Sequence, residues 1–110
     1  MQTETLYSKT LPAFKGFDVT FTAEIERDAY DTGQPEIDKE VNGKIDAGHY
    51  VHFVAVITLS ISGIALGTSA LGSCCHEEYD GFLTSGYLPQ MLEEAHGVAL
   101  EKSKAIAMGV

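Results

Sequence analysis

The sequence is poor in basic residues. Its 110 residues include only 7 Lys and Arg against 16 Asp and Glu, which gives a formal net charge of −9 at pH 7. Contact with a nucleic-acid backbone or an anionic membrane needs lysine and arginine to neutralise phosphate. We therefore expect no direct binding to nucleic acid and none to a membrane. This charge favours a basic protein surface as the partner, or it serves only to keep a solvated surface soluble.

The sequence also lacks the signals of secretion and membrane insertion. Its two cysteines are adjacent, at positions 74 and 75, and do not make a disulfide framework. The N-terminal stretch MQTETLYSKTLPAF has neither the basic region nor the apolar run of a signal peptide. The longest apolar-rich run, residues 51–71, is interrupted by Ser, Thr and Gly and is not typical of a membrane helix. These absences predict a cytoplasmic protein with reduced thiols.

Motifs of known enzyme sites are absent as well. Gly63, Gly67 and Gly72 fit neither a P-loop nor a Rossmann fingerprint. No H-E-x-x-H, EF-hand or serine-elbow pattern occurs in the sequence. We therefore expect no catalytic residue and no cofactor.

The first clear element in the sequence is a strand. Hydrophobic and polar side chains alternate strictly along FDVTFTAEIE, which predicts a half-buried strand over about 17–27. Before it, residues 6–11 are expected to form a short strand that Pro12 ends.

Two further strands are expected to form a hairpin. The apolar runs over about 50–62 and 63–72 are joined by Ser62-Gly63, a pair suited to a two-residue turn. An uninterrupted ladder from this turn sets Leu59 opposite Leu66. Turn chemistry and apolar pattern agree on this register.

The C-terminal part of the sequence predicts a helix over about 88–107. Its apolar residues recur at three- and four-residue spacing, and Pro89 suits the first turn. We expect Gly97 to mark close packing of this helix on the sheet. The predicted fold is one α+β domain over 1–110, an antiparallel sheet of three to four strands with the C-terminal helix packed on one face. The other face is apolar in its middle, so we expect a cover there, and a homodimer is one of the arrangements that would provide it.

Residues 27–48 form a polar, acidic excursion between the first long strand and the hairpin. Gly33, Pro35 and Gly48 punctuate it, and Asn42-Gly43 is a turn signal. We expect this segment to be partly extended, with short strands on either side of Asn42-Gly43.

The stretch GSCCHEEYD holds both cysteines of the sequence together with a dense set of polar side chains. Extending the hairpin register beyond residue 70 sets Cys74 opposite Val51 and His76 opposite His49. Cys74, His76 and His49 would then share one face and form either a metal site or a thiol activated by histidine. A β-bulge near Gly67 or Gly72 would remove this arrangement. The simpler interpretation is two reduced cysteines at a strand end, with no metal.

The carboxylates are the remaining candidates for a functional surface. Glu24 and Glu26 lie on the polar face of the first long strand, about 6.5–7 Å apart, a spacing similar to that of successive phosphates along a nucleic-acid strand. Such a row suits a cationic groove, although it also suits a solvated strand that resists aggregation. The predicted partner-binding set continues into the excursion and comprises Glu24, Glu26, Asp28, Asp31, Glu36, Asp38 and Glu40.

The chain resembles the small, acidic, single-domain proteins that phages and mobile elements encode against host defence, above all anti-CRISPR inhibitors. The resemblance rests on size, charge, the predicted sheet-plus-helix plan and the absence of enzyme motifs, and it assigns no role to any single residue. It implies a non-catalytic inhibitor that binds and occludes a basic, nucleic-acid-handling effector complex in the cytoplasm of the host cell. Two alternatives stay open: a small metal protein or thiol enzyme centred on Cys74, His76 and His49, and an oligomeric structural or accessory phage protein.

Overall fold

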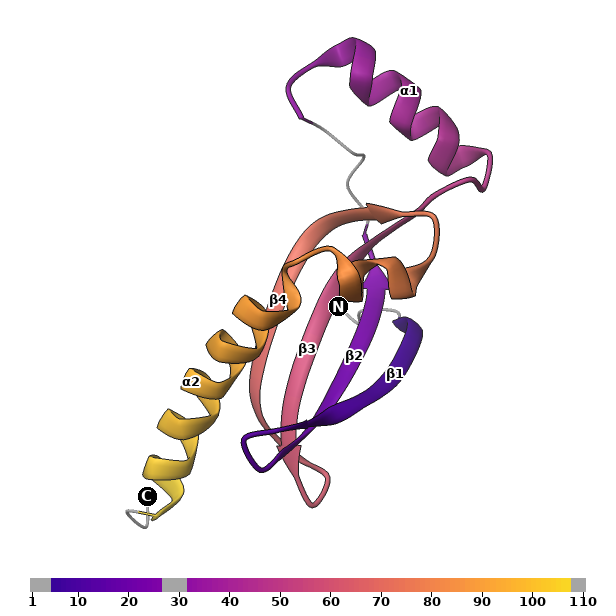
Figure 1. Cartoon of the computed structure of the whole chain (residues 1–110). Helices are drawn as coiled ribbons and strands as arrows, with labels where there is room; N and C mark the ends of the chain where they lie inside the picture. Colours follow the sequence, from indigo (N-terminus) through magenta and orange to yellow (C-terminus); the bar gives the residue numbers. More distant parts are fainter. Residues whose placement is uncertain (1–4, 27–31, 108–110) are drawn as a thin grey trace.

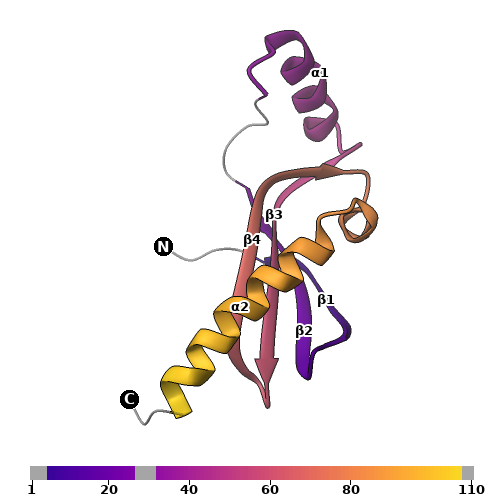
Figure 2. The ribbon, with the colours of Figure 1, turned by 60° about the vertical axis from the view of Figure 1, so that its left-hand side comes forward.

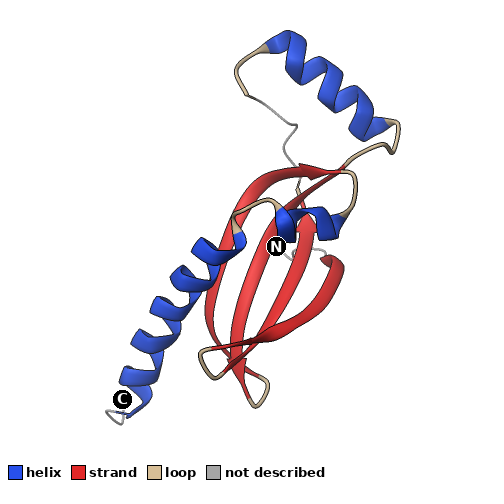
Figure 3. Ribbon diagram, in the orientation of Figure 1, coloured by secondary structure: helices blue, strands red, loops and turns tan. Residues whose placement is uncertain are grey.

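The computed structural model describes residues 5–26 and 32–107. It is an antiparallel sheet in the order β1-β2-β3-β4, with the C-terminal helix and a short 3-10 helix packed on one face (Figures 1 and 3). The predicted α+β class, with a C-terminal helix on an antiparallel sheet, is confirmed. The elements in chain order are β1 (Thr5–Phe14), β2 (Phe17–Ile25), α1 (Pro35–Asp46), β3 (Val51–Ile61), β4 (Ile64–His76), the 3-10 helix η1 (Tyr79–Thr84) and α2 (Leu88–Ala107).

Both β-hairpins turn on a residue followed by glycine. Ser62 and Gly63 have φ values of 52° and 81°, and Lys15 and Gly16 have 49° and 87°. Left-handed φ at both central positions is the type I′ geometry that matches the twist of antiparallel strands. The first turn was predicted, whereas the second was not. Pro12, expected to end β1, is accommodated because β1 is an edge strand with an irregular register there.

Strand β4 carries two bulges that displace the predicted register. Ile61 pairs with Ile64 as expected, but Leu59 pairs with Gly67 rather than Leu66. A second irregularity follows between the pairs Ala55–Leu71 and Phe53–Cys74. Each bulge inserts one extra residue into β4, so β4 reaches His76 instead of ending near residue 72.

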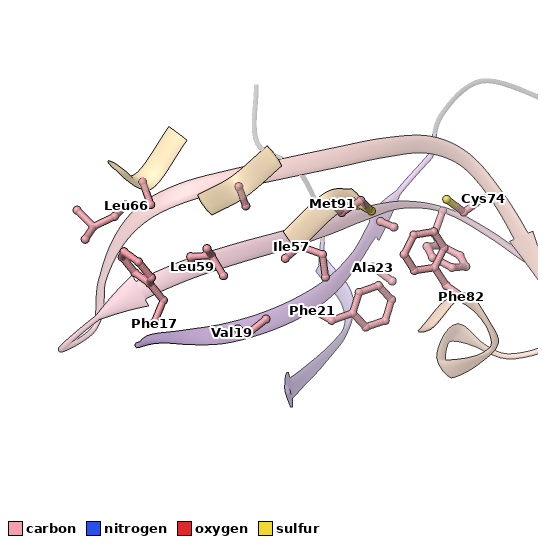
Figure 4. Packing of buried hydrophobic residues seen from close by; sticks show 14 residues of the cluster. Phe17, Val19, Phe21, Ala23, Ile57, Leu59, Leu66, Cys74, Phe82 and Met91 are labelled. Carbon is pink, nitrogen blue, oxygen red and sulfur yellow. The ribbon is translucent and has the colours of Figure 1, made fainter. Parts of the chain in front are cut away.

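The hydrophobic core lies between the helices and one face of the sheet (Figure 4). Helix α2 packs on β4 and β3 through Met91, Ala95 and Ala99, which recur every four residues and are buried. Gly67 makes this approach possible, because a Cβ at that position would lie 2.0 Å from the carbonyl oxygen of Ala95. The expectation that Gly97 marks close packing is wrong, since Gly97 is exposed and a Cβ there would meet nothing within 4 Å.

The segment predicted to be extended is instead largely helical. Helix α1 begins at Pro35, carries Glu36 and Asp38 in its first turn and Lys44 in its last, and so complements the helix dipole. Asn42-Gly43 lies inside the helix and makes no hairpin turn. Helix α1 projects beyond the end of the sheet (Figure 1), and none of its residues is buried.

The sheet face opposite α2 bears a row of threonines beside the half-buried Val54 and Val56. Thr10, Thr20, Thr58 and Thr68 follow one another across all four strands in register. Thr10 and Thr68 are exposed, and Thr20 and Thr58 are half-buried. Among the described helices, α2 and η1 have substantial contacts with the sheet. Both lie on the face away from these threonines (Figure 2). The cover expected for this face is therefore not supplied by a described helix.

Candidate functional site

The structure does not bring Cys74, His76 and His49 together. Strand pairing sets His76 opposite Val51 and Cys74 opposite Phe53, so the predicted cross-strand pair of His76 with His49 is wrong. The cause is the two bulges, which together shift β4 by two residues along β3. His49 lies in the exposed turn after α1. Among residues 5–26 and 32–107, no three His, Cys, Asp or Glu side chains are grouped as a metal site requires.

The two thiols lie in surroundings that keep them protonated. Cys74 is buried in the core and donates a hydrogen bond to the carbonyl oxygen of Leu71 at 3.3 Å. Cys75 points to the other side of the sheet, where strand pairing sets it opposite His52. Burial raises the pKa of both cysteines, because it disfavours the thiolate. A nucleophilic cysteine needs the opposite shift.

His76 belongs to an aromatic cluster above the core. Its ring lies 6.1 Å from that of Phe53 and 6.0 Å from that of Phe82, between centroids. Burial lowers the pKa of His76, since the charged imidazolium loses water there. Phe82 also stacks on Phe21 and on Tyr87. The ring neighbours of His76, Phe53 and Phe82, cannot bind a metal together with it. His76 is thus a packing residue at the edge of the core.

A polar cluster that the sequence did not suggest joins β1 to η1. Tyr7 donates a hydrogen bond to Asp80 at 2.7 Å, and the Lys9 ammonium lies 3.3 Å from the other carboxylate oxygen of Asp80. The hydrogen bond from Tyr7 lowers the pKa of Asp80, and the same bond raises the pKa of Tyr7. The ring of Tyr7 stacks on Tyr79 with 5.2 Å between centroids. Because more than 70 residues separate the partners in the sequence, no local pattern signals this cluster.

Two open clefts flank this cluster. The larger has a volume of about 580 Å³ and is lined by Lys44, His49, Tyr50, Glu77 and Glu78. The smaller, about 300 Å³, shares Glu77 and Glu78 and is otherwise lined by Tyr7, Val51, Tyr79 and Asp80. Carboxylates and tyrosine rings together suit the binding of cationic groups.

Glu77, Glu78 and Asp80 line these clefts, and the end of β2 and helix α1 carry further carboxylates at the same end of the molecule (Figure 1). Of the predicted partner-binding residues, Asp28 and Asp31 lie outside the described residues. Asp38 accepts hydrogen bonds from the amide and the hydroxyl of Thr32 at 2.9 and 2.8 Å. We refer to this region as the acidic end, formed by Glu24, Glu26, Glu36, Asp38, Glu40, Asp46, Glu77, Glu78 and Asp80.

Lysines are fewer at the acidic end, and two of them are already engaged. Lys9 pairs with Asp80, and Lys44 pairs with Glu40 at 3.6 Å. Lys39 is the third lysine of this end. At the far end of the molecule, Lys102 and Lys104 lie in the last turns of α2. Charge is therefore unevenly distributed along a molecule of 53 × 25 × 24 Å.

Comparison with protein-family models, with curated proteins and with solved structures finds no match. Within the described part of the chain, no helix has the length and apolar character needed to cross a membrane. The candidate site is consequently defined by its geometry and charge alone.

Proposed function

We propose that this protein is a non-catalytic inhibitor that binds a basic, nucleic-acid-handling effector complex of CRISPR type and occludes its nucleic-acid site. The observation that supports the proposal is the acidic end, where Glu77, Glu78 and Asp80 line clefts that also contain tyrosine rings, and where β2 ends and α1 projects. Carboxylates gathered on one surface match a channel lined by Lys and Arg, which would otherwise hold phosphates.

The position of the acidic end suits occlusion. Helix α1 lies beyond the end of the sheet, farther from the core than β2 (Figure 1). None of the residues of α1 is buried, and Glu36 and Glu40 are exposed. The proposed contact therefore requires no unfolding of the core.

The thiol enzyme is less well supported than the interaction protein. Burial raises the pKa of both cysteines, and the partner histidine that the sequence suggested is two residues out of register. No observation of the described residues favours the metal or thiol alternative over the proposal.

The test is inhibition of reconstituted effector complexes. Fluorescence anisotropy of labelled target DNA measures how much of it each complex binds with and without this protein. We expect the protein to displace DNA from at least one complex, and to do so less effectively as salt is raised, because exposed charges are screened. Unchanged DNA binding by every complex tested would contradict the proposal.

A matched pair of charge-reversal variants locates the contact. Glu36→Lys with Glu77→Lys changes two exposed carboxylates of the acidic end, and Asp18→Lys with Glu101→Lys changes two exposed carboxylates elsewhere. Both variants change the net charge by the same amount. We expect the first to raise the half-inhibitory concentration at least tenfold and the second to change it little. Equal effects of the two would show that net charge alone acts, and would contradict a specific surface.

A further inference from the structure

Helix α1 has few stabilising contacts with the rest of the described residues: Thr32 donates two hydrogen bonds to Asp38, and Lys44 lies over the ring of Tyr50. It is 12 residues long, its N-cap residue Gln34 makes no side-chain cap hydrogen bond, and none of its residues is buried. Gly43 lies in its interior and weakens a helix by about 1 kcal/mol relative to alanine. Isolated helices of about 12–15 residues are marginal in water even for favourable sequences. A contact outside the described chain is therefore expected to stabilise α1.

The apolar residues of α1 define the face that such a contact would cover. Ile37, Val41 and Ile45 follow one another at four-residue spacing and so form one stripe along the helix. Ile37 is 47% exposed, and Val41 and Ile45 are only partly covered. We call these three residues the α1 stripe.

One flank of the α1 stripe carries one charge of each sign. Glu40 and Lys44 flank it on one side and lie 3.6 Å apart. Asp38 and Asn42 flank it on the other side. At 100° per residue, Glu36 and Asp46 fall on the opposite side of the helix. A partner with a basic groove would favour a helix face whose flanks carry only acidic residues. The flank of the α1 stripe that holds Glu40 instead also holds Lys44.

We propose that α1 pairs with α1 of a second copy, antiparallel about a twofold axis, along the α1 stripe. In this arrangement Ile37 of one copy packs beside Ile45 of the other, and the two Val41 residues meet at the axis. The order of Glu40 and Lys44 along the helix is reversed in the second copy, so each Glu40 faces the second copy's Lys44. A parallel pair would set the Glu40 flank of one copy against the Asp38 flank of the other, and so bring two carboxylates together, which is unfavourable. The seam is thus self-complementary in shape and in charge, as an isologous interface must be.

The interface is small, so the dimer is expected to be weak. A 12-residue helix is about 18 Å long, and one helix pair buries less than the roughly 1,200 Å² that stable complexes start from. We expect a dissociation constant on the order of 100 µM. Because this proposal concerns self-association, it stands whether or not the inhibitor function is correct.

Sedimentation equilibrium of the full chain between 10 µM and 1 mM tests the proposal. We expect a reversible monomer–dimer equilibrium that Ile37→Ser with Ile45→Ser weakens at least tenfold. The matched control is Val98→Ser with Leu100→Ser, which removes two apolar side chains of α2 that are 51% and 45% exposed. A monomer at every concentration would overturn the proposal, as would a dimer that only the α2 variant dissociates. Unchanged thermal unfolding of the α1 variant shows that it is folded.

A charge exchange tests the antiparallel register. Glu40→Lys and Lys44→Glu each place like charges across the proposed seam, and each is expected to weaken the dimer about threefold to tenfold. The double exchange Glu40→Lys with Lys44→Glu restores both cross-seam pairs, so dimerisation is expected to recover. Failure of the double variant to recover, with its fold intact, would overturn the antiparallel pairing. An unaltered protein that dimerises but inhibits no effector complex would instead contradict the proposed function alone.

Discussion

The two α-helices of this protein differ in how they are stabilised. Helix α2, 20 residues long, buries Met91, Ala95 and Ala99 against the sheet and approaches it so closely that Gly67 has no room for a side chain. Helix α1, in contrast, buries none of its residues and has no more than scattered contacts with the other elements. The α2 side of the sheet is the structural part of the molecule, and α1 is the part available for contacts with other molecules.

Replacing Gly67 should have the largest effect on stability, because this residue lets α2 pack closely on the sheet. Gly67→Ala places a Cβ 2.0 Å from the Ala95 carbonyl oxygen and 2.9 Å from the Ala99 Cβ, so α2 must move away from β4. We expect a loss of about 3 kcal/mol in the free energy of unfolding, measured by urea denaturation monitored by circular dichroism. Gly97→Ala, where a Cβ meets nothing within 4 Å, is the control and should stabilise by up to about 1 kcal/mol. Similar effects of the two substitutions would show that α2 is not tightly docked.

Shortening one apolar side chain in each helix compares them directly. Met91→Ala removes a buried side chain of α2 and should cost about 2 kcal/mol. Ile37→Ala removes a side chain that is 47% exposed and should change global stability by less than about 0.5 kcal/mol. Dilute samples, at which the proposed dimer is dissociated, are required. An equal loss for the two variants would mean that α1 belongs to the cooperative core.

Gly43→Ala should strengthen α1 without changing the stability of the core. Gly43 has open space around it and no left-handed φ, so alanine fits and favours the helix by about 1 kcal/mol. We expect slower amide hydrogen exchange over residues 37–46 and an unchanged midpoint of thermal unfolding. A raised midpoint would indicate that α1 and the sheet unfold together.

The pH dependence of stability should report the burial of His76 in the aromatic cluster between η1 and the sheet. Burial lowers the pKa of His76 in the folded state, so the unfolded chain binds the proton more readily. Stability is therefore expected to fall as pH drops below the ordinary histidine range. Urea unfolding of the protein and of His76→Gln at pH 7.5 and 5.5 measures the difference. A variant with the same pH dependence as the parent would contradict this assignment, because the remaining histidines and carboxylates are common to both.

The sequence predicted the features of the fold that depend on local patterns. Strict alternation located β2, the Ser62-Gly63 turn located the β3–β4 hairpin, and apolar spacing located α2. The excursion was misinterpreted because Asn42-Gly43, a strong turn signal, lies inside a helix whose other signals, Pro35 and the spaced apolar residues, are weaker individually. The sequence indicates that a bulge is possible near Gly67 or Gly72, but the predicted register omits it, because the sequence does not show the tertiary contact involved: Leu66 and Gly67 are both buried, with α2 packed against Gly67.

The candidate site was only partly predictable for the same reason. Charge and strand alternation made Glu24, Glu26, Glu36, Asp38 and Glu40 candidates, because these local patterns need no knowledge of the fold, and their role in binding stays a prediction. Tyr7 and Asp80 were missed, since only the sheet order and the position of η1 bring them within 2.7 Å. The cysteine–histidine cluster failed because its geometry depended on an exact register over a long strand, and each bulge changes that register by one residue.

The hydrogen bond from Tyr7 to Asp80 bears on the order in which the chain folds. Every strand of the sheet pairs with its neighbour in sequence, so most native contacts close short loops and are expected to form early. The bond between Tyr7 and Asp80 instead joins residues 73 apart and closes the longest loop of this region. We predict that it forms after the main folding barrier, so that Tyr7→Phe leaves the refolding rate unchanged and speeds unfolding in stopped-flow measurements. Slower refolding of this variant would show that the edge strand β1 belongs to the folding nucleus. The docking of β1 on the rest of the sheet would then occur before the main folding barrier.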